Sequence, residues 1–323
     1  MRKITFYFLL TNFLLAIDFQ TDKYKFILNP SFFFTYDYAQ KKSGNILLTT
    51  NSFYFPRVIL DIKNQYQDMF FLKFYLDLAD RGNISVYELC GGIKPKKELE
   101  IIFGRFKQPL SYEVIMYPLA AYFVEPSMLY YLKAPSIWDM GIGFFWSFKK
   151  GEANINLVNG SGWTAVFDNN EWKDISGRFL FIPFNNLSFG TSFYYGKIGY
   201  GKIKDLLPFF SCGFEFNYKD SFNIIIFEYL YRSEKDVAYY NYQKHGFCFI
   251  LGWQLEKLYP FLRFEFKEEK KEIKEINKEF GFSFSLNYFL KNKRFKLTPN
   301  FGYYYYSKTC HLLKFIFQFQ ASI

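Results

Sequence analysis

The chain has 323 residues, of which 24% are aromatic and 50% hydrophobic, and a formal net charge of +10. Its mean hydropathy is -0.10, and the sequence lacks the repeated apolar runs of a polytopic helical membrane protein. The 20 glycines and 11 prolines form no repeat, which excludes collagen-like and disordered chains, and the length suits one large domain or two small ones.

The N-terminus has the pattern of a signal peptide. Arg2 and Lys3 form a charged start, residues 6–15 are apolar, and Ala16 is a small residue before a cleavage site. We therefore predict a signal peptide over residues 1–16 and a single β-barrel domain over 17–323. The alternative is an uncleaved anchor or a core strand. Export makes nucleic acid an implausible partner, so the positive charge points to anionic solutes or to lipid head groups.

From residue 24 onward the chain alternates between apolar and polar residues in blocks of about ten, the length that a tilted strand needs to cross a bilayer. In the clearest block, Phe280, Phe282 and Phe284 share one face, and Ser283 and Ser285 share the other. About 16 such blocks predict an all-β fold, a transmembrane antiparallel barrel of about 16 strands. They lie near 24–36, 52–64, 69–79, 84–93, 98–106, 138–148, 151–159, 173–182, 187–196, 208–218, 222–232, 244–254, 259–267, 278–290, 294–305 and 311–320.

The connections between blocks alternate in length, as they do in outer-membrane barrels with short periplasmic turns and long outer loops. Short joints are expected at 94–97, 183–186, 219–221 and 291–293. Longer polar loops are expected at 37–51, 160–172, 197–207, 233–243 and 268–277, and the longest connection is 107–137. A soluble sandwich has no reason to keep this alternation.

Periodicity alone does not decide which face of the barrel is wet. Three features favour a membrane barrel with an aromatic outer surface. They are the signal peptide, a barrel too large for its own side chains to fill, and the tyrosines grouped at strand ends. On this interpretation Phe70, Leu72, Phe74 and Leu76 face lipid. The predicted lumen-facing charges are Arg57, Asp61, Lys63, Lys73, Asp77, Arg178, Glu215, Arg263, Glu265 and Lys296.

The segment 107–137, between the fifth and sixth strands, is too apolar for a solvated surface loop. We expect it to fold into the barrel and to narrow the lumen. This places Lys107, Glu113, Glu125 and Lys133 at a constriction. The alternative is an outer cap or a contact between subunits. If the segment narrows the lumen, deletion of residues 112–133 should raise the single-channel conductance.

Residues 98–183 resemble the phosphate-selective porin O and P-like family. The similarity is carried by five short motifs. They are GRFKQPLSYE at 104–113, FVEPS at 123–127, DMGIG at 139–143, Asn159-Gly160, and the run from Lys173 to Arg178 followed by Pro183. The resemblance implies a trimeric, 16-stranded pore with an inward loop in the outer membrane of a Gram-negative-type bacterium. Pro126 stands where the family pattern has arginine, and no dense arginine ladder is present.

These patterns predict a porin, a passive, water-filled diffusion channel for small hydrophilic solutes with a weak preference for anions, among them phosphate. The residues expected to attract anions are Arg57, Lys73, Arg105, Lys107, Lys133 and Arg178. We expect no catalysis, cofactor or metal site, and the partners are outer-membrane lipids, the solutes and two further copies of the chain. The alternatives are a closed structural or adhesive barrel, or a barrel hydrolase that uses His245 or His311, the latter near Ser307.

The four cysteines, Cys90, Cys212, Cys248 and Cys310, lie far apart and include no C-x-x-C motif. With two histidines in the whole chain, zinc coordination is not expected. We predict isolated thiols, buried or facing lipid.

Overall fold

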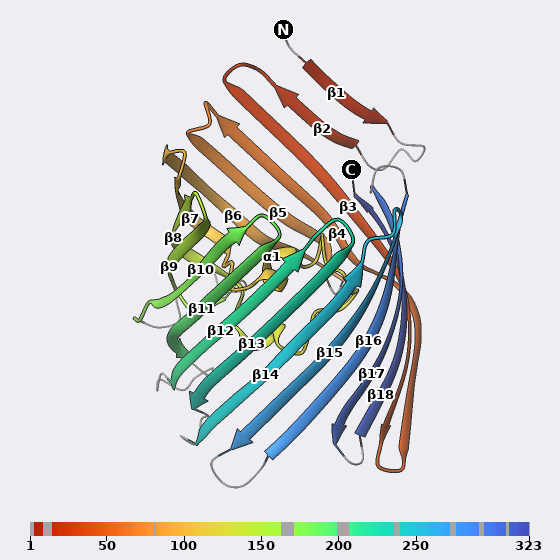
Figure 1. The fold of residues 1–323 in the computed structure, drawn as a ribbon. Coiled ribbons are helices and arrows are strands. Elements are labelled where there is room, and N and C mark those ends of the chain that lie inside the picture. Colours follow the sequence, from red (N-terminus) through yellow and green to blue (C-terminus); the bar gives the residue numbers. More distant parts are fainter. Residues whose placement is uncertain are drawn as a thin grey trace.

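The computed structural model describes residues 3–8, 15–80, 82–162, 171–198, 207–235, 240–271, 276–290, 294–307 and 310–322. Sixteen antiparallel strands, β3 to β18, form a closed barrel (Figure 1). The strands are β3 (Tyr24–Ser43), β4 (Ile46–Tyr66), β5 (Phe70–Asp80), β6 (Asn83–Lys96), β7 (Leu99–Lys107), β8 (Trp138–Phe148), β9 (Gly151–Val158), β10 (Asp174–Phe184), β11 (Leu187–Ile198), β12 (Leu207–Lys219), β13 (Asn223–Lys235), β14 (Asn241–Trp253), β15 (Leu258–Lys271), β16 (Ile276–Leu290), β17 (Phe295–Ser307) and β18 (Cys310–Ser322).

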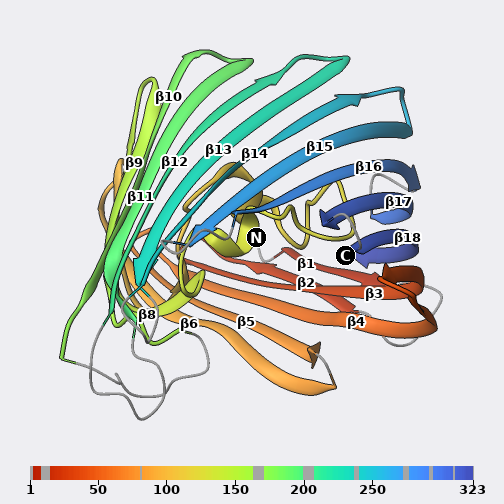
Figure 2. The same ribbon diagram turned by 90° about the horizontal axis from the view of Figure 1, so that it is seen from below.

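The barrel closes because the last strand pairs with the first strand of the ring. The β18–β3 ladder runs from the pair Cys310 and Ser43 to the pair Ser322 and Ser31, and every other strand pairs with its neighbour in sequence. Seen from below, the strands form a ring (Figure 2). Closure leaves no unpaired edge along the ring, which a strand-built membrane protein requires. The predicted barrel and its strand number are confirmed.

Two further strands precede the ring. Strands β1 (Lys3–Phe8) and β2 (Leu15–Gln20) form a hairpin, and β2 pairs with the start of β3. The predicted signal peptide overlaps this hairpin. Its cleavage stays a prediction, and residues 9–14 lie outside the described part of the chain. Among the described residues, no helix is both long and apolar enough to span a membrane.

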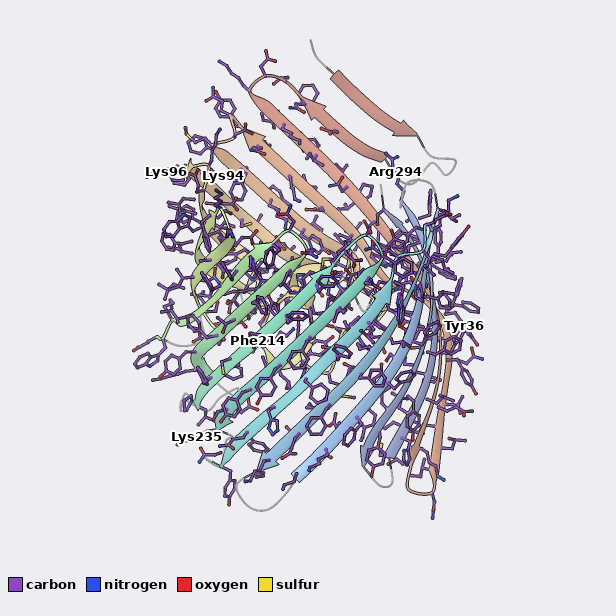
Figure 3. The ribbon with its side chains drawn as sticks, viewed as in Figure 1. Tyr36, Lys94, Lys96, Phe214, Lys235 and Arg294 are labelled. Atoms are coloured by element: carbon purple, nitrogen blue, oxygen red, sulfur yellow. The ribbon has the colours of Figure 1, made fainter. Side chains whose placement is uncertain are left out.

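The alternation of short and long connections is also present. Short turns such as 97–98 and 185–186 lie at the end of the barrel that carries both termini (Figure 1). The longest connection, between β7 and β8, starts from the opposite end. In Figure 3, Lys94 and Lys96 mark the end with the short turns, and Lys235 marks the other.

Three predicted loops are wrong in extent, because the flanking strands extend into them. The segment 37–51 forms the ends of β3 and β4, which are joined by a two-residue turn at Gly44, where φ is +60°. The segments 233–243 and 268–277 are shortened in the same way. The density of lysine and glutamate in residues 267–279 is typical of a solvated outer loop, but opposite charges on adjacent strands also stabilise a sheet. Lys267 and Glu279, for example, pair at 2.9 Å across β15 and β16.

Successive side chains point to opposite faces of the wall, apart from local bulges such as the register shift opposite Tyr75 and Leu76. On β16, Phe280 and Phe282 are 48% and 41% exposed, whereas Ser283 and Ser285 are fully buried. Phe214 on β12 is among the exposed aromatic residues (Figure 3). An exposed aromatic outer face suits lipid, where a charge at the midplane costs about 2–4 kcal/mol. The inward polar residues are buried from solvent because another part of the chain fills much of the lumen.

Candidate pore

The lumen contains the chain between β7 and β8, residues 108–137, which we call the inner segment. It forms a short helix, α1 (Tyr112–Met116), and a 3-10 turn, η1 (Tyr130–Leu132). Figure 2 shows its coils inside the ring of strands. Ser111 caps α1, because its hydroxyl accepts the N–H of Val114 at 3.3 Å.

Three inward carboxylates accept hydrogen bonds from main-chain N–H groups of the inner segment. The pairs are Glu215 on β12 with Tyr112 at 2.6 Å, Glu228 on β13 with Glu113 at 3.0 Å, and Glu265 on β15 with Met128 at 2.7 Å. The first two satisfy N–H groups in the first turn of α1, which have no partner within the helix. The barrel wall therefore completes the hydrogen bonding of the inner segment.

Each of these carboxylates has its own cation. Arg178 pairs with Glu215, Lys133 pairs with Glu228 at 2.5 Å, and Arg263 pairs with Glu265 at 3.1 Å. Burial alone would lower the pKa of Lys133, but the charges of Glu228 and Glu113 outweigh it, so the pKa lies above its ordinary value. Removing one member of a buried pair leaves an uncompensated charge, at a cost of about 3–5 kcal/mol.

The other side of the barrel binds carbonyl groups of the inner segment. Ser285 and Asn287 on β16 both donate to the carbonyl oxygen of Tyr122 at 2.9 Å. Lys296 on β17 donates to that of Ala121 at 3.0 Å. Glu125 accepts from Lys314 on β18 at 2.5 Å. The inner segment is thus hydrogen-bonded to β12, β13 and β15–β18.

Strands β13 to β15 also present an apolar surface to the lumen. Phe123, Leu129 and Leu132 of the inner segment pack there on six buried residues of the wall: Ile224, Ile226, Leu230, Cys248, Ile250 and Phe261. The ring of Tyr122 stacks on Phe261 with centroids 4.3 Å apart. The void left at this contact is about 30 Å³, room for no more than a few water molecules. On this side the inner segment packs closely on the wall.

The opposite side is open. A cavity of about 450 Å³ lies between the inner segment and strands β4 to β8. Its charged lining consists of Lys63, Lys73, Lys94, Lys107, Glu88 and Glu100. Lysines outnumber carboxylates four to two, so the lining carries an excess of positive charge.

The structure brings together part of the predicted anion-attracting set. Lys73 and Lys107 both line the cavity. Lys73 pairs with Glu88 at 2.5 Å. Lys107 donates to the carbonyl of Tyr117, and its ammonium lies 5.2 Å from the ring of Trp138.

Arg57 lies next to this group, where the β4–β5 ladder ends. Its guanidinium pairs with Asp77 at 3.0 Å and lies 5.6 Å from the ring of Tyr117. Asp77 also accepts the N–H groups of Val58 and Ala79, at 3.0 and 3.1 Å. Arg57 is therefore held between the wall and the inner segment.

The other predicted residues are elsewhere. Glu113, Glu125 and Lys133 bond the inner segment to the wall, and Arg178 pairs with Glu215 within the wall. None of these four residues lines the cavity. Arg105 pairs in register with Leu89, which is 51% exposed on the outer face. Its guanidinium donates to the carbonyl of Val86 at 3.1 Å. Strand parity turns Arg105 outward, so we leave it out of the pore lining.

Sequence reasoning missed Glu88, Lys94 and Glu100 as cavity residues. The alternation of side chains along a strand could have predicted two of them, since Glu88 and Lys94 are evenly spaced with Cys90 on the same face of β6. It also missed Glu228, the one carboxylate in the apolar start of β13 (Asn223–Leu230). A lone charge in such a run signals a paired inward position.

The cysteines are free, as predicted: Cys90 and Cys248 are buried, and Cys212 and Cys310 are half-buried. In the ranges that the structure describes, no group of His, Cys, Asp and Glu is arranged to hold a metal ion. His311 accepts or donates a hydrogen bond with the exposed hydroxyl of Tyr303 at 2.8 Å. His245 packs beside Phe266, with ring centroids 6.3 Å apart.

No family model and no curated protein matches the sequence. The fold, however, is shared with solved outer-membrane proteins. An anion-selective porin from Comamonas acidovorans aligns with a TM-score of 0.72 at 10% identity, over 93% of this chain and 100% of that one. The outer-membrane channel DcaP of Acinetobacter baumannii aligns with a TM-score of 0.67 at 11% identity, over 94% and 99%. OmpT, an outer-membrane protein of Vibrio cholerae in its trimer form, aligns with a TM-score of 0.69 at 10% identity, over 94% and 100%.

The fold is therefore that of an outer-membrane porin barrel. At these identities the likeness concerns the fold, and it does not single out the phosphate-selective porin O and P-like family. The aromatic outer face and the closed ring agree with a place in the outer membrane of a Gram-negative-type cell.

Proposed function

We propose that the protein is a passive outer-membrane channel for small hydrophilic solutes with a weak preference for anions. The observation that carries this proposal is the cavity beside β4–β8, whose lining has four lysines and two glutamates. Fixed charges of one sign in a low-dielectric channel raise the local concentration of counter-ions. Solutes would pass along this wall, because the packed side leaves no room.

The inner segment, in this proposal, is the constriction. It confines the route to one side of the barrel, with Lys73 and Lys107 facing the solute. Glu113, Glu125 and Lys133 contribute indirectly, because they fix the position of the inner segment. Phosphate is one candidate anion among several.

The test is the reversal potential of the purified protein in planar bilayers under a salt gradient. We expect anion selectivity, and Lys73→Gln should reduce it. Lys235→Gln, at the far end of β13 and outside the cavity lining, is the matched control. Clear cation selectivity of the unmodified channel would contradict the anion preference.

The two buried cysteines test the route itself. Cys90 lines the open cavity, and Cys248 lines the void of about 30 Å³. In variants that keep one of these cysteines and carry serine at the other three, a small anionic thiosulfonate should modify Cys90 and reduce the current. Cys248 should stay unmodified. The reverse pattern would place the route on the packed side.

A homotrimer is part of the proposal. It is supported by the resemblance to trimeric porins and by the trimer form recorded for the Vibrio cholerae neighbour. Native mass spectrometry of the detergent-solubilised protein should give three times the mass of one chain. A monomer that remains a folded, conducting barrel would refute this part alone.

We also propose that the protein is not an enzyme. Tyr303 and Leu313, the neighbours of His311 on the same face, are exposed on the outside of the barrel, and His245 shares the face of the exposed Phe247. Neither imidazole faces the lumen. A hydrolase activity abolished by His245→Ala or His311→Ala would overturn this view.

The second candidate is a closed structural barrel, which the many bonds between the inner segment and the wall favour. Zero conductance from a barrel that still shows heat-modifiable electrophoretic migration would support it over a channel.

A further inference from the structure

We propose that the cavity beside β4–β8 binds small monocarboxylates with a flat apolar or aromatic body as they pass. The inference rests on the proposed channel function and names its solute class. It follows from three features of the cavity: an aromatic wall, a lysine with no carboxylate partner, and a matching volume.

The aromatic wall is formed by Phe71 on β5 and Phe145 on β8, which pack on the buried side chains of Ile102 and Phe106 on β7. Phe106 and Phe145 meet edge to face, with centroids 6.2 Å apart and planes at 76°. A channel for inorganic ions alone gains nothing from inward rings, because apolar surface is costly to hydrate. A solute with an aromatic face would recover that cost by stacking.

Two inward glycines leave room for these rings against the wall. A β-carbon at Gly92 would lie 2.4 Å from the ring of Phe71. A β-carbon at Gly143 would lie 2.7 Å from the ring of Phe145 and 3.1 Å from that of Phe106. Any side chain at either position would push the rings into the lumen. The glycines thus keep the rings against the wall and the cavity open.

The charges favour a single carboxylate. Lys73 and Lys94 are each within 3 Å of a carboxylate, Glu88 at 2.5 Å and Glu100 at 2.9 Å. In the described part of the chain, no carboxylate lies within ion-pair distance of Lys107, whose ammonium donates to the carbonyl of Tyr117. A solute carboxylate can replace this neutral partner and gain a charge-assisted bond. A multiply charged anion would meet Glu88 and Glu100.

The volume fits such a solute. About 450 Å³ falls within the range of about 300–1,000 Å³ that small-molecule sites occupy. The cavity is therefore large enough for a carboxylated ring, and both the Lys107 ammonium and the aromatic wall line it.

The experiment measures chloride current through single channels with benzoate, acetate or inorganic phosphate added at equal concentration. Benzoate should interrupt the current in a saturable manner, at concentrations about tenfold lower than acetate or phosphate, since one aromatic contact is worth about that factor. Equal effects of benzoate and acetate, or stronger block by phosphate, would overturn the inference.

Variants separate the ring contact from the charge. Phe145→Ala should weaken benzoate block about tenfold and leave acetate unchanged, whereas Phe144→Ala, whose ring is exposed on the outer face, should change neither. Lys107→Gln should weaken benzoate and acetate alike. Folding is checked by heat-modifiable migration, and if Phe145→Ala does not fold, Phe145→Leu replaces it. A channel that carries chloride but ignores benzoate refutes this inference alone, while a folded barrel without current refutes the channel.

Discussion

Replacement of Glu228 by glutamine tests how the inner segment is held. Glu228 has two partners in that segment: the ammonium of Lys133 at 2.5 Å and the main-chain N–H of Glu113 at 3.0 Å. Lys133 is 3% exposed, so its charge has almost no access to water. The glutamine keeps the shape and the acceptor of the side chain but removes the charge that balances Lys133.

The expected cost follows from this burial. Loss of one partner of a buried ion pair costs about 3–5 kcal/mol. The lower end applies here, because Glu113 lies 3.7 Å from the same ammonium and partly replaces the lost charge. A change of about 3 kcal/mol shifts the balance between bound and released inner segment roughly a hundredfold. The barrel wall stays paired, because Glu228→Gln removes no hydrogen bond between strands.

The assay combines single-channel recording with limited proteolysis of the inner segment. Glu228→Gln should give a larger, noisier conductance and faster cleavage near residues 117–127. Tyr229→Phe, the adjacent outward position, is the control. Combining Glu228→Gln with Lys133→Met should restore the unmodified behaviour, since no unpaired lysine charge stays buried and the glutamine still accepts the N–H of Glu113. If Glu228→Gln matches the unmodified channel in both assays, the ion pair does not hold the segment.

Three further predictions concern other parts of the molecule. Phe261→Ala should loosen the inner segment by about 3–5 kcal/mol in denaturant titrations of the refolded barrel, and Phe264→Ala, on the outer face, should cost far less. Phe214→Lys puts a charge on the lipid face and should lower folding stability in lipid vesicles by about 2–4 kcal/mol, whereas Leu47→Lys near the β3–β4 turn should cost about 1 kcal/mol or less. The N–H groups of Asn223 and Phe222 lower the pKa of Asp220 to about 2. The ionised carboxylate therefore stabilises the β12–β13 turn above the unfolded pKa of about 3.9, and this stabilisation is lost as the pH falls through 2. Hydrogen exchange at the turn should show this pH dependence, and Asp220→Asn should flatten it.

The strand pattern was predictable because each wall residue meets one of two solvents. Trp138–Phe148 was placed to the residue from its alternation alone, and Gly151–Val158 within one residue. Lipid on one side and polar groups on the other impose a period of two, which can be recognised without knowing which strands are neighbours. The loop at 37–51 failed because β3 and β4 extend past the point where lipid imposes this pattern, and there pairing alone sustains the strands.

The contacts of the inner segment could not be predicted, because they depend on which distant strands face it across the ring. The apolar character of residues 107–137 indicated that the segment packs on something. Glu228 and Glu265 lie far beyond it in sequence, and nothing local links them to Glu113 or Met128. Likewise, strand parity predicted that Lys73 faces inward. The division of the lumen into a packed side and an open side, however, depends on which strands the inner segment packs against.

The strands on which the inner segment packs can nevertheless be recognised in the sequence. A strand with lipid outside and water inside alternates, whereas one that is covered on both faces becomes continuously apolar. Strand β13 contains Ile224, Ile225 and Ile226 near its start, and β14 contains the run Phe247–Leu251, so both lose the alternation over these residues. The inward members of the two runs belong to the cluster that packs on the inner segment: Ile224, Ile226, Cys248 and Ile250. Breaks in period two within a barrel therefore mark the wall on which an inner segment packs. They also explain why deletion of residues 112–133 is a poorer test than Glu228→Gln, since it would leave this apolar wall facing water.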